Sequence, residues 1–194
     1  MKIIDKINST AIPLPLENVD TDQIIPARFL KAIDQIGFGE KLFYDWRYLD
    51  DQVVNPDFVL NNPIFEGGIL IAGRNFGCGS SREHAAWALA GYGIKAVISS
   101  HFADIFKGNA LNNGILPIEV SDQQLNEFIQ RVYDVPSTVF SIDLKQQTLS
   151  IEQDFSMEFE IDSYKKICLL NGFSDLDYLL KLNSEISAFE AITI

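Results

Sequence analysis

The middle of the chain repeats one hydrophobic pattern, in which a short apolar run is followed by apolar positions at helical spacing. Three runs have the length and composition of buried strands: residues 68–72, 94–99 and 114–120. Helical spacing follows the first two runs, in residues 80–90 and 102–112, and Gly91 ends the earlier helix. Strands that are joined by crossover helices pair in parallel, so this pattern predicts parallel pairing.

The segments on either side of this region follow other patterns. Residues 9–16 alternate weakly between apolar and polar, which predicts an N-terminal strand. Ser121 and Gln124 form a capping-box motif for a helix that runs to about Val132. Beyond that helix, three stretches alternate as antiparallel strands do: residues 138–144, 147–152 and 155–161.

The end of the chain, about residues 162–191, is helical by pattern, in residues 162–170 and again in 174–191. We expect this segment to pack against the sheet or against a partner. Together the elements predict the α/β class, with a mixed sheet flanked by helices. No repeat, low-complexity tract or linker divides the sequence, so a single domain over residues 1–194 is expected.

Residues 29–58 interrupt these regular patterns. Gly37, Gly39, Asn55 and Pro56 break up a stretch that is rich in aromatic side chains: Phe38, Phe43, Tyr44, Trp46 and Tyr48. Long irregular loops are uncommon in compact domains unless they cover or bind something. We therefore expect a lid-like loop with exposed aromatic rings. The simpler alternative is that the rings pack on the domain.

Composition narrows the classes of partner. The formal net charge is -12 and Lys and Arg do not cluster, which opposes the neutralisation of phosphates, so no nucleic-acid partner is expected. Charges at Lys2, Asp5 and Lys6 interrupt the opening segment, and no uncharged apolar run approaches about 18 residues. Neither a signal peptide nor a membrane span is predicted. Cys78 and Cys168 lie far apart in the sequence, so we expect reduced thiols and a cytoplasmic protein.

The candidate chemistry lies in residues 73–84, where a glycine-rich turn opens into the first predicted helix. Backbone N–H groups at a helix N-terminus favour anions, and Ser80 and Ser81 add hydroxyls. Arg82 adds a planar guanidinium that matches a carboxylate. These groups predict a pocket for a carboxylate. On the residues alone, a capping box between Ser80 and Glu83, with no ligand, is the simpler interpretation.

Other chemistries are less well supported by this stretch. It matches neither a dinucleotide fingerprint, nor a P-loop, nor a nucleophile elbow. Cys78 is a candidate nucleophile, because a helix N-terminus lowers the pKa of a thiol, and His84 or His101 would be the base. Neither histidine has a partner at metal-ligand spacing, so no metal site is predicted and structural roles are expected.

Four stretches together carry a resemblance to a known family: residues 18–26, 43–47, 75–85 (NFGCGSSREHA) and 100–109 (SHFADIFKGN). They resemble the aconitase-like swivelling domain, in the form found in isopropylmalate dehydratase small subunits, over nearly the whole chain. The resemblance implies a swivelling β/β/α domain that binds no cofactor itself. It completes its active site with a large subunit that carries a [4Fe-4S] cluster, in a heterodimer or a higher assembly. Two cysteines are too few for such a cluster, which takes about four ligands.

The reaction that the resemblance implies is the interconversion of 2- and 3-isopropylmalate, small dicarboxylates, by dehydration and rehydration in leucine biosynthesis. Related small subunits of homoaconitase or citramalate isomerase stay open as alternatives, as does a module that only binds an anion or a partner.

The resemblance also implies roles for individual residues. Ser80 would be the base that removes and returns the carbon-bound proton. Arg82 would bind a substrate carboxylate and favour a serine alkoxide, with Ser81 assisting. Thr21 and Asp22 match a motif that lies beside the site in related enzymes. From the residues alone, the stretch from Asp20 to Asp22 predicts an Asx-turn or a helix cap.

Two further groups complete the expected site. Phe29 and Leu30, which follow Pro26, are expected to contact the isopropyl group of the substrate. Such a contact is worth about 1.5 to 3 kcal/mol if the group is fully desolvated. His84 is expected to support the site from behind the residues that touch the substrate.

Overall fold

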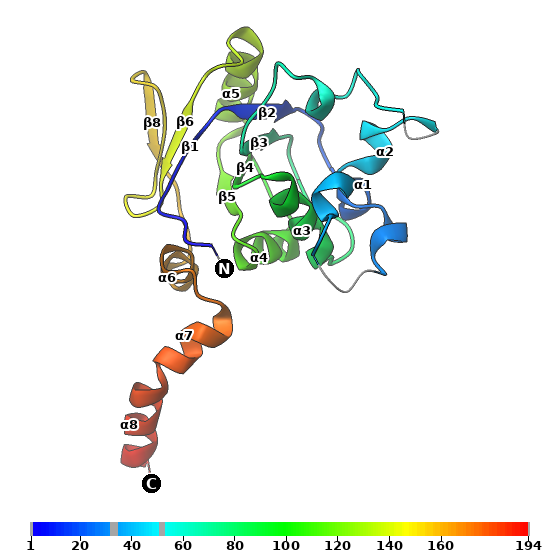
Figure 1. Cartoon of the computed structure of the whole chain (residues 1–194). Helices are drawn as coiled ribbons and strands as arrows, with labels where there is room; N and C mark the ends of the chain where they lie inside the picture. The colour runs from blue at the N-terminus through cyan, green and yellow to red at the C-terminus, as the bar shows by residue number, and fades with distance from the viewer. Residues whose placement is uncertain (1, 32–34, 51–52, 194) are drawn as a thin grey trace.

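The computed structural model describes residues 2–31, 35–50 and 53–193, which form two four-stranded sheets (Figure 1). The parallel sheet contains, in spatial order, β2 (Ala11–Leu14), β3 (Ile69–Ala72), β4 (Ala96–Ser99) and β5 (Leu116–Glu119). The antiparallel sheet contains β1 (Lys6–Ser9), β6 (Phe140–Asp143), β7 (Thr148–Ile151) and β8 (Phe155–Glu158). The predicted α/β class is confirmed, although its parallel and antiparallel pairs lie in two sheets rather than in one mixed sheet.

The division into two sheets occurs at Thr10, inside the segment predicted as one strand. Ser9 lies opposite Phe140 in the antiparallel sheet, whereas Ala11 lies opposite Ile69 in the parallel sheet. Alternation of apolar and polar positions specifies which side chains are buried, but it does not specify which sheet a strand joins. The hydrophobic pattern therefore could not locate this break.

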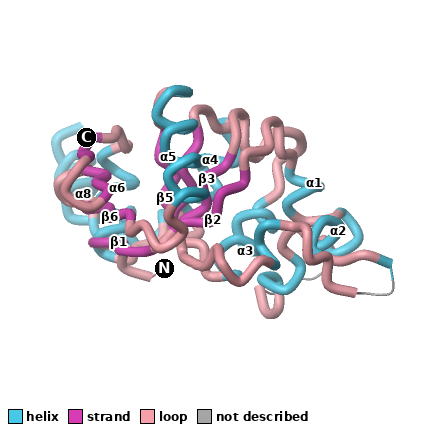
Figure 2. Tube along the Cα trace, turned by 90° about the horizontal axis from the view of Figure 1, so that it is seen from above, coloured by secondary structure: helices cyan, strands magenta, loops and turns pink. Residues whose placement is uncertain are grey.

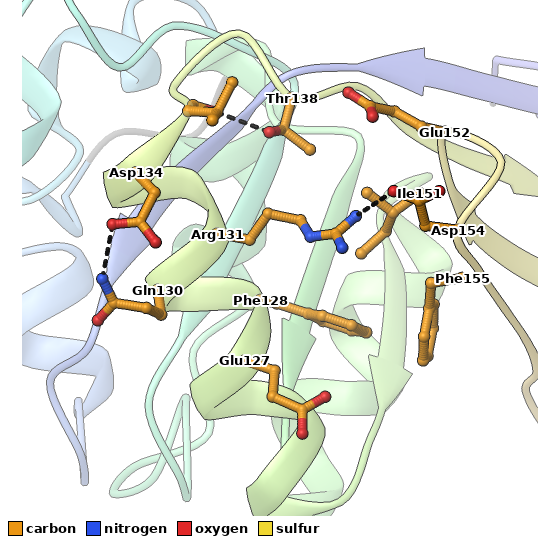
Figure 3. A pocket seen from close by; sticks show the side chains of 11 residues that line it. Glu127, Phe128, Gln130, Arg131, Asp134, Thr138, Ile151, Glu152, Asp154 and Phe155 are labelled. Carbon is orange, nitrogen blue, oxygen red and sulfur yellow. Dashed lines mark hydrogen bonds and ion pairs between the residues drawn. The ribbon is translucent and has the colours of Figure 1, made fainter.

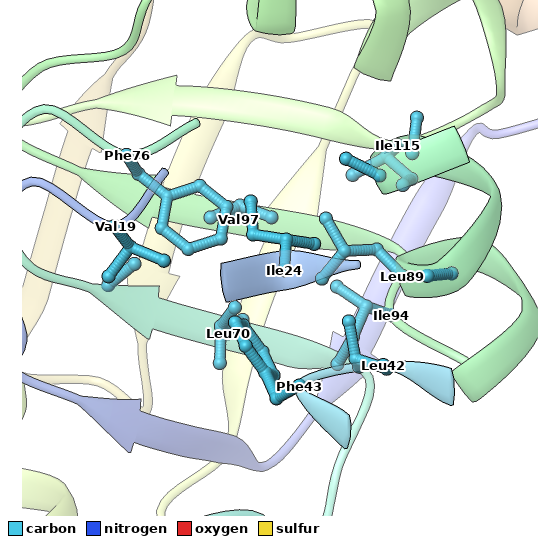
Figure 4. Packing of buried hydrophobic residues seen from close by; sticks show 14 of the residues in the cluster. Val19, Ile24, Leu42, Phe43, Leu70, Phe76, Leu89, Ile94, Val97 and Ile115 are labelled. Atoms are coloured by element: carbon cyan, nitrogen blue, oxygen red, sulfur yellow. The ribbon is translucent and has the colours of Figure 1, made fainter. Parts of the chain in front are cut away.

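The parallel sheet is buried on both faces. Successive side chains along each strand point in opposite directions, so each strand contributes to two separate core clusters. Three helices follow its strands: α3 (Glu83–Tyr92), α4 (Asp104–Asn112) and α5 (Asp122–Asp134). On one face, Leu70 and Val97 pack in a core cluster with Leu89 of α3 (Figure 4). On the other face, Ile69 and Ile98 join a second cluster with α5 and the antiparallel sheet. The two clusters hold the carboxyl edge of the parallel sheet in place.

The capping box predicted for α5 is confirmed. The N–H of Gln124 donates to the Ser121 hydroxyl at 3.2 Å, and the N–H of Ser121 donates to the Gln124 side chain at 2.9 Å. The helical end of the chain is confirmed, but the second predicted stretch, residues 174–191, is divided in two, so that three helices are present: α6 (Ser163–Asn171), α7 (Asp175–Lys181) and α8 (Asn183–Thr193). Figure 2 shows the C-terminal helices with β1 and β6 at one end of the molecule, and α1 to α3 at the other. Among the described residues, no helix combines the length and apolarity needed to cross a membrane.

Residues 29–58 are more ordered than the pattern predicts. The described parts of this region and its borders form short helices: η1 (Ala27–Phe29), η2 (Phe38–Lys41), α2 (Tyr44–Arg47) and η4 (Val59–Asn61). Phe38 and Phe43 are fully buried, and Phe43 stacks on Trp46 with 5.4 Å between ring centroids. The prediction of exposed aromatic rings is therefore wrong, because the rings bury one another against the domain although their spacing has no regular period. Residues 32–34 and 51–52 lie outside the described residues, and the lid role stays a prediction.

Candidate active site

Three loops meet at the carboxyl edge of the parallel sheet. They follow β2, β3 and β4, and the first contains the short helix α1 (Thr21–Ile24). Two isolated parallel bridges join these loops beyond the strands, Asp20 with Cys78 and Phe76 with Phe102. Ligands of open α/β sheets bind outside the carboxyl ends of the strands. This edge is therefore the place in the fold that favours a ligand site.

The loop between β3 and α3 is shaped by two glycines. Gly77 has a φ of 78° and Gly79 a φ of 86°, in the left-handed region that favours glycine. A Cβ atom at Gly77 would also overlap the Phe106 ring. Hydrogen bonds hold the loop against the loop after β2, since the Gly77 N–H donates to the Val19 carbonyl at 2.8 Å and the Thr21 N–H donates to the Cys78 carbonyl at 2.9 Å. These bonds join the loop after β3 to the loop after β2 just before Ser80.

Two side-chain contacts connect the predicted site residues. The buried Thr21 hydroxyl donates to the Ser80 carbonyl oxygen at 2.9 Å. The mostly buried Arg82 guanidinium pairs with the Asp22 carboxylate. The side chains of Ser80 and Ser81 are exposed. The structure thus brings four residues predicted for the site into direct contact, although they lie about 60 positions apart in the sequence.

The alternative capping box between Ser80 and Glu83 does not form. Helix α3 begins at Glu83, and Arg82 occupies the N-cap position with an extended backbone and no capping bond from its side chain. The predicted start of this helix at residue 80 is wrong, because the left-handed Gly79 and the bond from Thr21 keep Ser80 outside the helix. The Ser80 hydroxyl is therefore not used as a cap, and the N–H groups of the first turn of α3 keep their capacity to face an anion.

Comparison with known proteins agrees with this arrangement. A family model described as the aconitase C-terminal domain matches residues 1–123, more than half of the chain. A 3-isopropylmalate dehydratase small subunit from Cytophaga hutchinsonii is 55% identical over 185 residues, which cover 95% of this chain and 92% of the relative. The chain belongs to this small-subunit family. A second relative of the same name, from Roseiflexus sp. strain RS-1, is 50% identical over 192 residues, covering 98% of this chain and 94% of the relative.

A solved structure supports the same family. The crystal structure of 3-isopropylmalate dehydratase from Methanocaldococcus jannaschii matches with a TM-score of 0.66 and 29% sequence identity. The match covers 94% of this chain and 98% of that one. The resemblance inferred from the four sequence stretches is confirmed.

In this member of the small-subunit family, the residues predicted to meet the isopropyl group pack against the core and a neighbouring aromatic ring. Phe29 and Leu30 are half-buried against the core cluster of Figure 4. The Phe29 ring contacts Tyr44 edge-on at 5.1 Å, and the Arg28 guanidinium lies 4.8 Å from its centroid. The role of both residues toward a substrate stays a prediction.

His84 and Cys78 both have partners within this chain, and the supporting role expected of His84 stays a prediction. The His84 ring packs against Trp87 and Phe38, with centroid distances of 4.5 and 5.5 Å. The Cys78 thiol donates to the Asn18 carbonyl at 3.3 Å, and burial together with nearby Asp20 raises its pKa above the ordinary value. The expectation of a lowered thiol pKa is wrong, because α3 begins five residues after Cys78. A thiol that stays protonated at neutral pH is a weak nucleophile.

A metal ion or an iron–sulfur cluster needs several ligating side chains close together. Within residues 2–31, 35–50 and 53–193, no three His, Cys, Asp or Glu side chains gather in a way that could hold a metal ion. Cys78 lies in the β3–α3 loop, whereas Cys168 is buried in α6. An iron–sulfur cluster takes about four ligands, mostly thiolates, so these residues do not fit one.

A cavity of about 660 Å³ lies elsewhere, between α5 and strands β7 and β8 (Figure 3). Its charged lining residues are four acids and one base: Glu127, Asp134, Glu152, Asp154 and Arg131. Arg131 and Asp154 form an ion pair at 4.0 Å. Such a surface repels an anionic substrate, so the cavity does not compete with the edge of the parallel sheet as a dicarboxylate site.

The residues that hold the loops together include some that the sequence did not single out. The Asn75 side-chain amide donates to Asn18 at 2.9 Å, and both residues have positive φ, at 61° and 55°. Asparagine tolerates the left-handed region better than most residues, so the residue type at these two positions is the sequence feature that could have indicated the turns. The helix-cap interpretation of Asp20 is confirmed, since Asp20 and Gln23 form a capping box at the start of α1.

Proposed function

We propose that this chain completes the active site of a 3-isopropylmalate dehydratase by presenting Ser80 and Arg82 to the substrate. In leucine biosynthesis this enzyme interconverts 2- and 3-isopropylmalate through isopropylmaleate, by loss and re-addition of water. One observation carries the proposal: Thr21 and Asp22, from the loop after β2, contact Ser80 and Arg82 at the carboxyl edge of the parallel sheet. These contacts anchor the backbone of Ser80 and the guanidinium of Arg82 to the same neighbouring loop, which supports a joint role for the two residues.

Arg82 is proposed to bind a carboxylate of the substrate. Its guanidinium carries five N–H donors in a planar fork, so the bond to Asp22 leaves other donors for a ligand. Asp22 also limits the rotation of the long Arg82 side chain, which reduces the conformational entropy lost on binding. In a chain with a formal net charge of -12, a fixed cation at the site is needed to attract an anion.

Ser80 is proposed as the base that accepts the carbon-bound proton on dehydration and returns it on rehydration. A serine hydroxyl is a very weak base, so its alkoxide must be stabilised strongly. Two sources of positive potential lie next to it in the chain, the Arg82 guanidinium and the uncapped first turn of α3. Ser81, also exposed, is proposed to assist by hydrogen bonding to the substrate.

Thr21 is proposed as a positioning residue, because its hydroxyl fixes the backbone carbonyl of Ser80. Thr21→Val is expected to lower the free energy of unfolding by about 1 kcal/mol and kcat by roughly tenfold, since loss of one bond loosens Ser80. Thr138→Val removes another buried hydroxyl, which donates to the Val135 carbonyl at 2.7 Å, and serves as the matched control. Chemical unfolding and steady-state kinetics would separate the two variants. An equal loss of kcat in both would assign Thr21 a purely structural role.

The site is proposed to be completed by a large subunit. Ser80 and Ser81 are exposed on this chain, so a second surface is needed to exclude water from the reaction. The four-iron cluster is assigned to that subunit, where it would act as a Lewis acid on the substrate hydroxyl. Phe29 and Leu30 are proposed to border the pocket for the isopropyl group, and the described part of residues 29–58 to act as its lid. The cytoplasm, where thiols stay reduced, is the proposed compartment.

The function is tested by reconstitution. Loss of the ultraviolet absorbance of isopropylmaleate is followed with this chain alone, with an anaerobically reconstituted large subunit alone, and with both. Hydration is expected only in the mixture. The same mixture is offered the unsaturated intermediates of the homoaconitase and citramalate reactions. Faster hydration of either compound would replace the substrate assignment, and a stable complex that hydrates none of the three would favour a module that only binds an anion or a partner.

A further inference from the structure

Helix α7 is attached to the rest of the chain by its polar and aromatic side chains. Asp175 accepts hydrogen bonds from the Tyr164 hydroxyl at 2.5 Å and from the Lys165 ammonium group at 2.7 Å, both on α6. The Tyr178 ring meets Tyr164 edge-on at 4.6 Å. The Lys181 ammonium lies 4.1 Å from the centroid of the Phe173 ring. Asp175, Tyr178 and Lys181 follow each other at intervals of three residues, which is one side of a helix.

The apolar side chains of α7 point the other way. Leu176, Leu179 and Leu180 are 64%, 54% and 64% exposed, and no residue of α7 is buried. On α8, Ile186 and Phe189 are 43% and 69% exposed. A surface helix normally buries its apolar side and exposes its polar side, so α7 is reversed. Figure 1 shows α7 and α8 extending away from both sheets.

We propose that residues 174–193, here called the C-terminal arm, insert their leucine side into an apolar groove of the large subunit. This inference rests on the proposed function, which supplies the partner. The spacing of Leu176, Leu179 and Leu180 is that of a helix that binds in a groove through positions i, i+3 and i+4. The polar contacts to α6 hold α7 in place with this side outward, so part of the ordering cost of binding is met before the partner arrives.

Coverage of the comparisons favours the large subunit as the occupant. The aconitase C-terminal domain model ends at residue 123, so the arm lies outside the part of the chain that it matches. The Cytophaga hutchinsonii small subunit aligns over 185 of the 194 residues, which leaves nine unaligned, fewer than the arm contains. At least part of the arm therefore aligns with this relative, which is a small subunit itself. A domain at the C-terminus of a longer protein is held by the polypeptide, whereas a separate chain needs additional contacts to replace that tether.

The charge of the arm defines the groove further. The arm carries four acids and one base: Asp175, Asp177, Glu185, Glu190 and Lys181. Its net charge is therefore -3. The complementary surface is an apolar groove with a basic rim, which fits a large subunit better than a second copy of this acidic chain, whose arm would repel it.

The experiment compares two variants of similar chemistry in the full chain. Leu180→Asp places a charge on the leucine side of the arm, and Ile64→Asp places one at a site of similar exposure, 60%, outside the arm. The dissociation constant for the reconstituted large subunit is measured by titration, together with kcat at saturation and the midpoint of thermal unfolding. Leu180→Asp is expected to weaken binding at least tenfold, as for a central apolar contact. Its kcat and unfolding midpoint should stay unchanged, and Ile64→Asp should behave as wild type.

The outcomes distinguish this inference from the proposed function. An unchanged dissociation constant for Leu180→Asp, in a mixture that hydrates isopropylmaleate, would overturn the inference alone. Arm-dependent binding in a wild-type mixture without hydratase activity would overturn the proposed function and leave the docking role standing. Light scattering of this chain alone tests the other occupant. A dimer that Leu180→Asp dissociates, and that the large subunit does not displace, would overturn the inference in favour of self-association.

Discussion

Ser80→Ala is expected to reduce turnover of the assembled enzyme by roughly 10²- to 10⁴-fold, the usual range for loss of a general base. The hydroxyl that we propose as the base is removed, while the Ser80 carbonyl that Thr21 holds remains. The loop should therefore keep its conformation and the complex should still form. Steady-state hydration of isopropylmaleate, with the large subunit in saturating amounts, measures the loss.

The control for this variant is Ser156→Ala, the same chemical change at an exposed position of β8, outside the three loops. It should leave kcat, binding of the large subunit and thermal unfolding as in wild type. Full turnover by Ser80→Ala would remove the base assignment and move the search to other groups at the carboxyl edge. Loss of complex formation in Ser80→Ala alone would assign Ser80 to the subunit interface.

Arg82→Lys is expected to lower kcat/KM by about 10- to 100-fold. Lysine keeps the positive charge but loses the planar fork that can hold Asp22 and a substrate carboxylate together. A hydrogen bond to a charged group contributes about 1.5–3 kcal/mol, which corresponds to that range. Initial rates over a range of substrate concentrations would show whether the loss lies in KM, in kcat or in both.

Arg74→Lys provides the matched comparison. Arg74 lies in the same loop after β3, but it is exposed and pairs with Asp122 on α5 at 3.7 Å. An exposed ion pair contributes little, so this variant should retain wild-type kinetics. If Arg82→Lys also retained wild-type kcat/KM, Arg82 would be limited to holding the loop through Asp22.

Much of the fold could be predicted from local pattern. The strands at 68–72, 94–99 and 114–120 correspond to β3, β4 and β5, and the helical end of the chain corresponds to α6, α7 and α8. The strands are short, continuous apolar runs and are buried almost throughout, as such runs predict, and the helices follow the helical spacing of apolar positions. The capping box at Ser121 was also predicted, because both of its partners lie within one helical turn.

The errors share one physical cause. Ser80 and Glu83 have the spacing of a cap, but a hydroxyl 59 residues away holds Ser80 outside the helix. Phe38 and Phe43 occur at irregular spacing, and they are buried where Trp87 packs against the first ring and Phe58 against the second. In each case a contact between distant segments overrides the local preference, and propensities of a few tenths of a kcal/mol are too weak to resist it.

For this protein, local pattern and motif are sufficient for the class of fold, the order of most elements and the family, because each depends on residue types at short spacing. Tertiary structure decides three features of the site: the pairing of Asp22 with Arg82, the hydrogen bond from Thr21 to Ser80, and the raised pKa of Cys78. They exist only where the loops after β2 and β3 meet. The outward leucine side of α7 likewise depends on a tertiary contact, the attachment of α7 to α6. Contacts of this kind depend on distances between segments far apart in the chain, and the linear order of residues does not contain those distances.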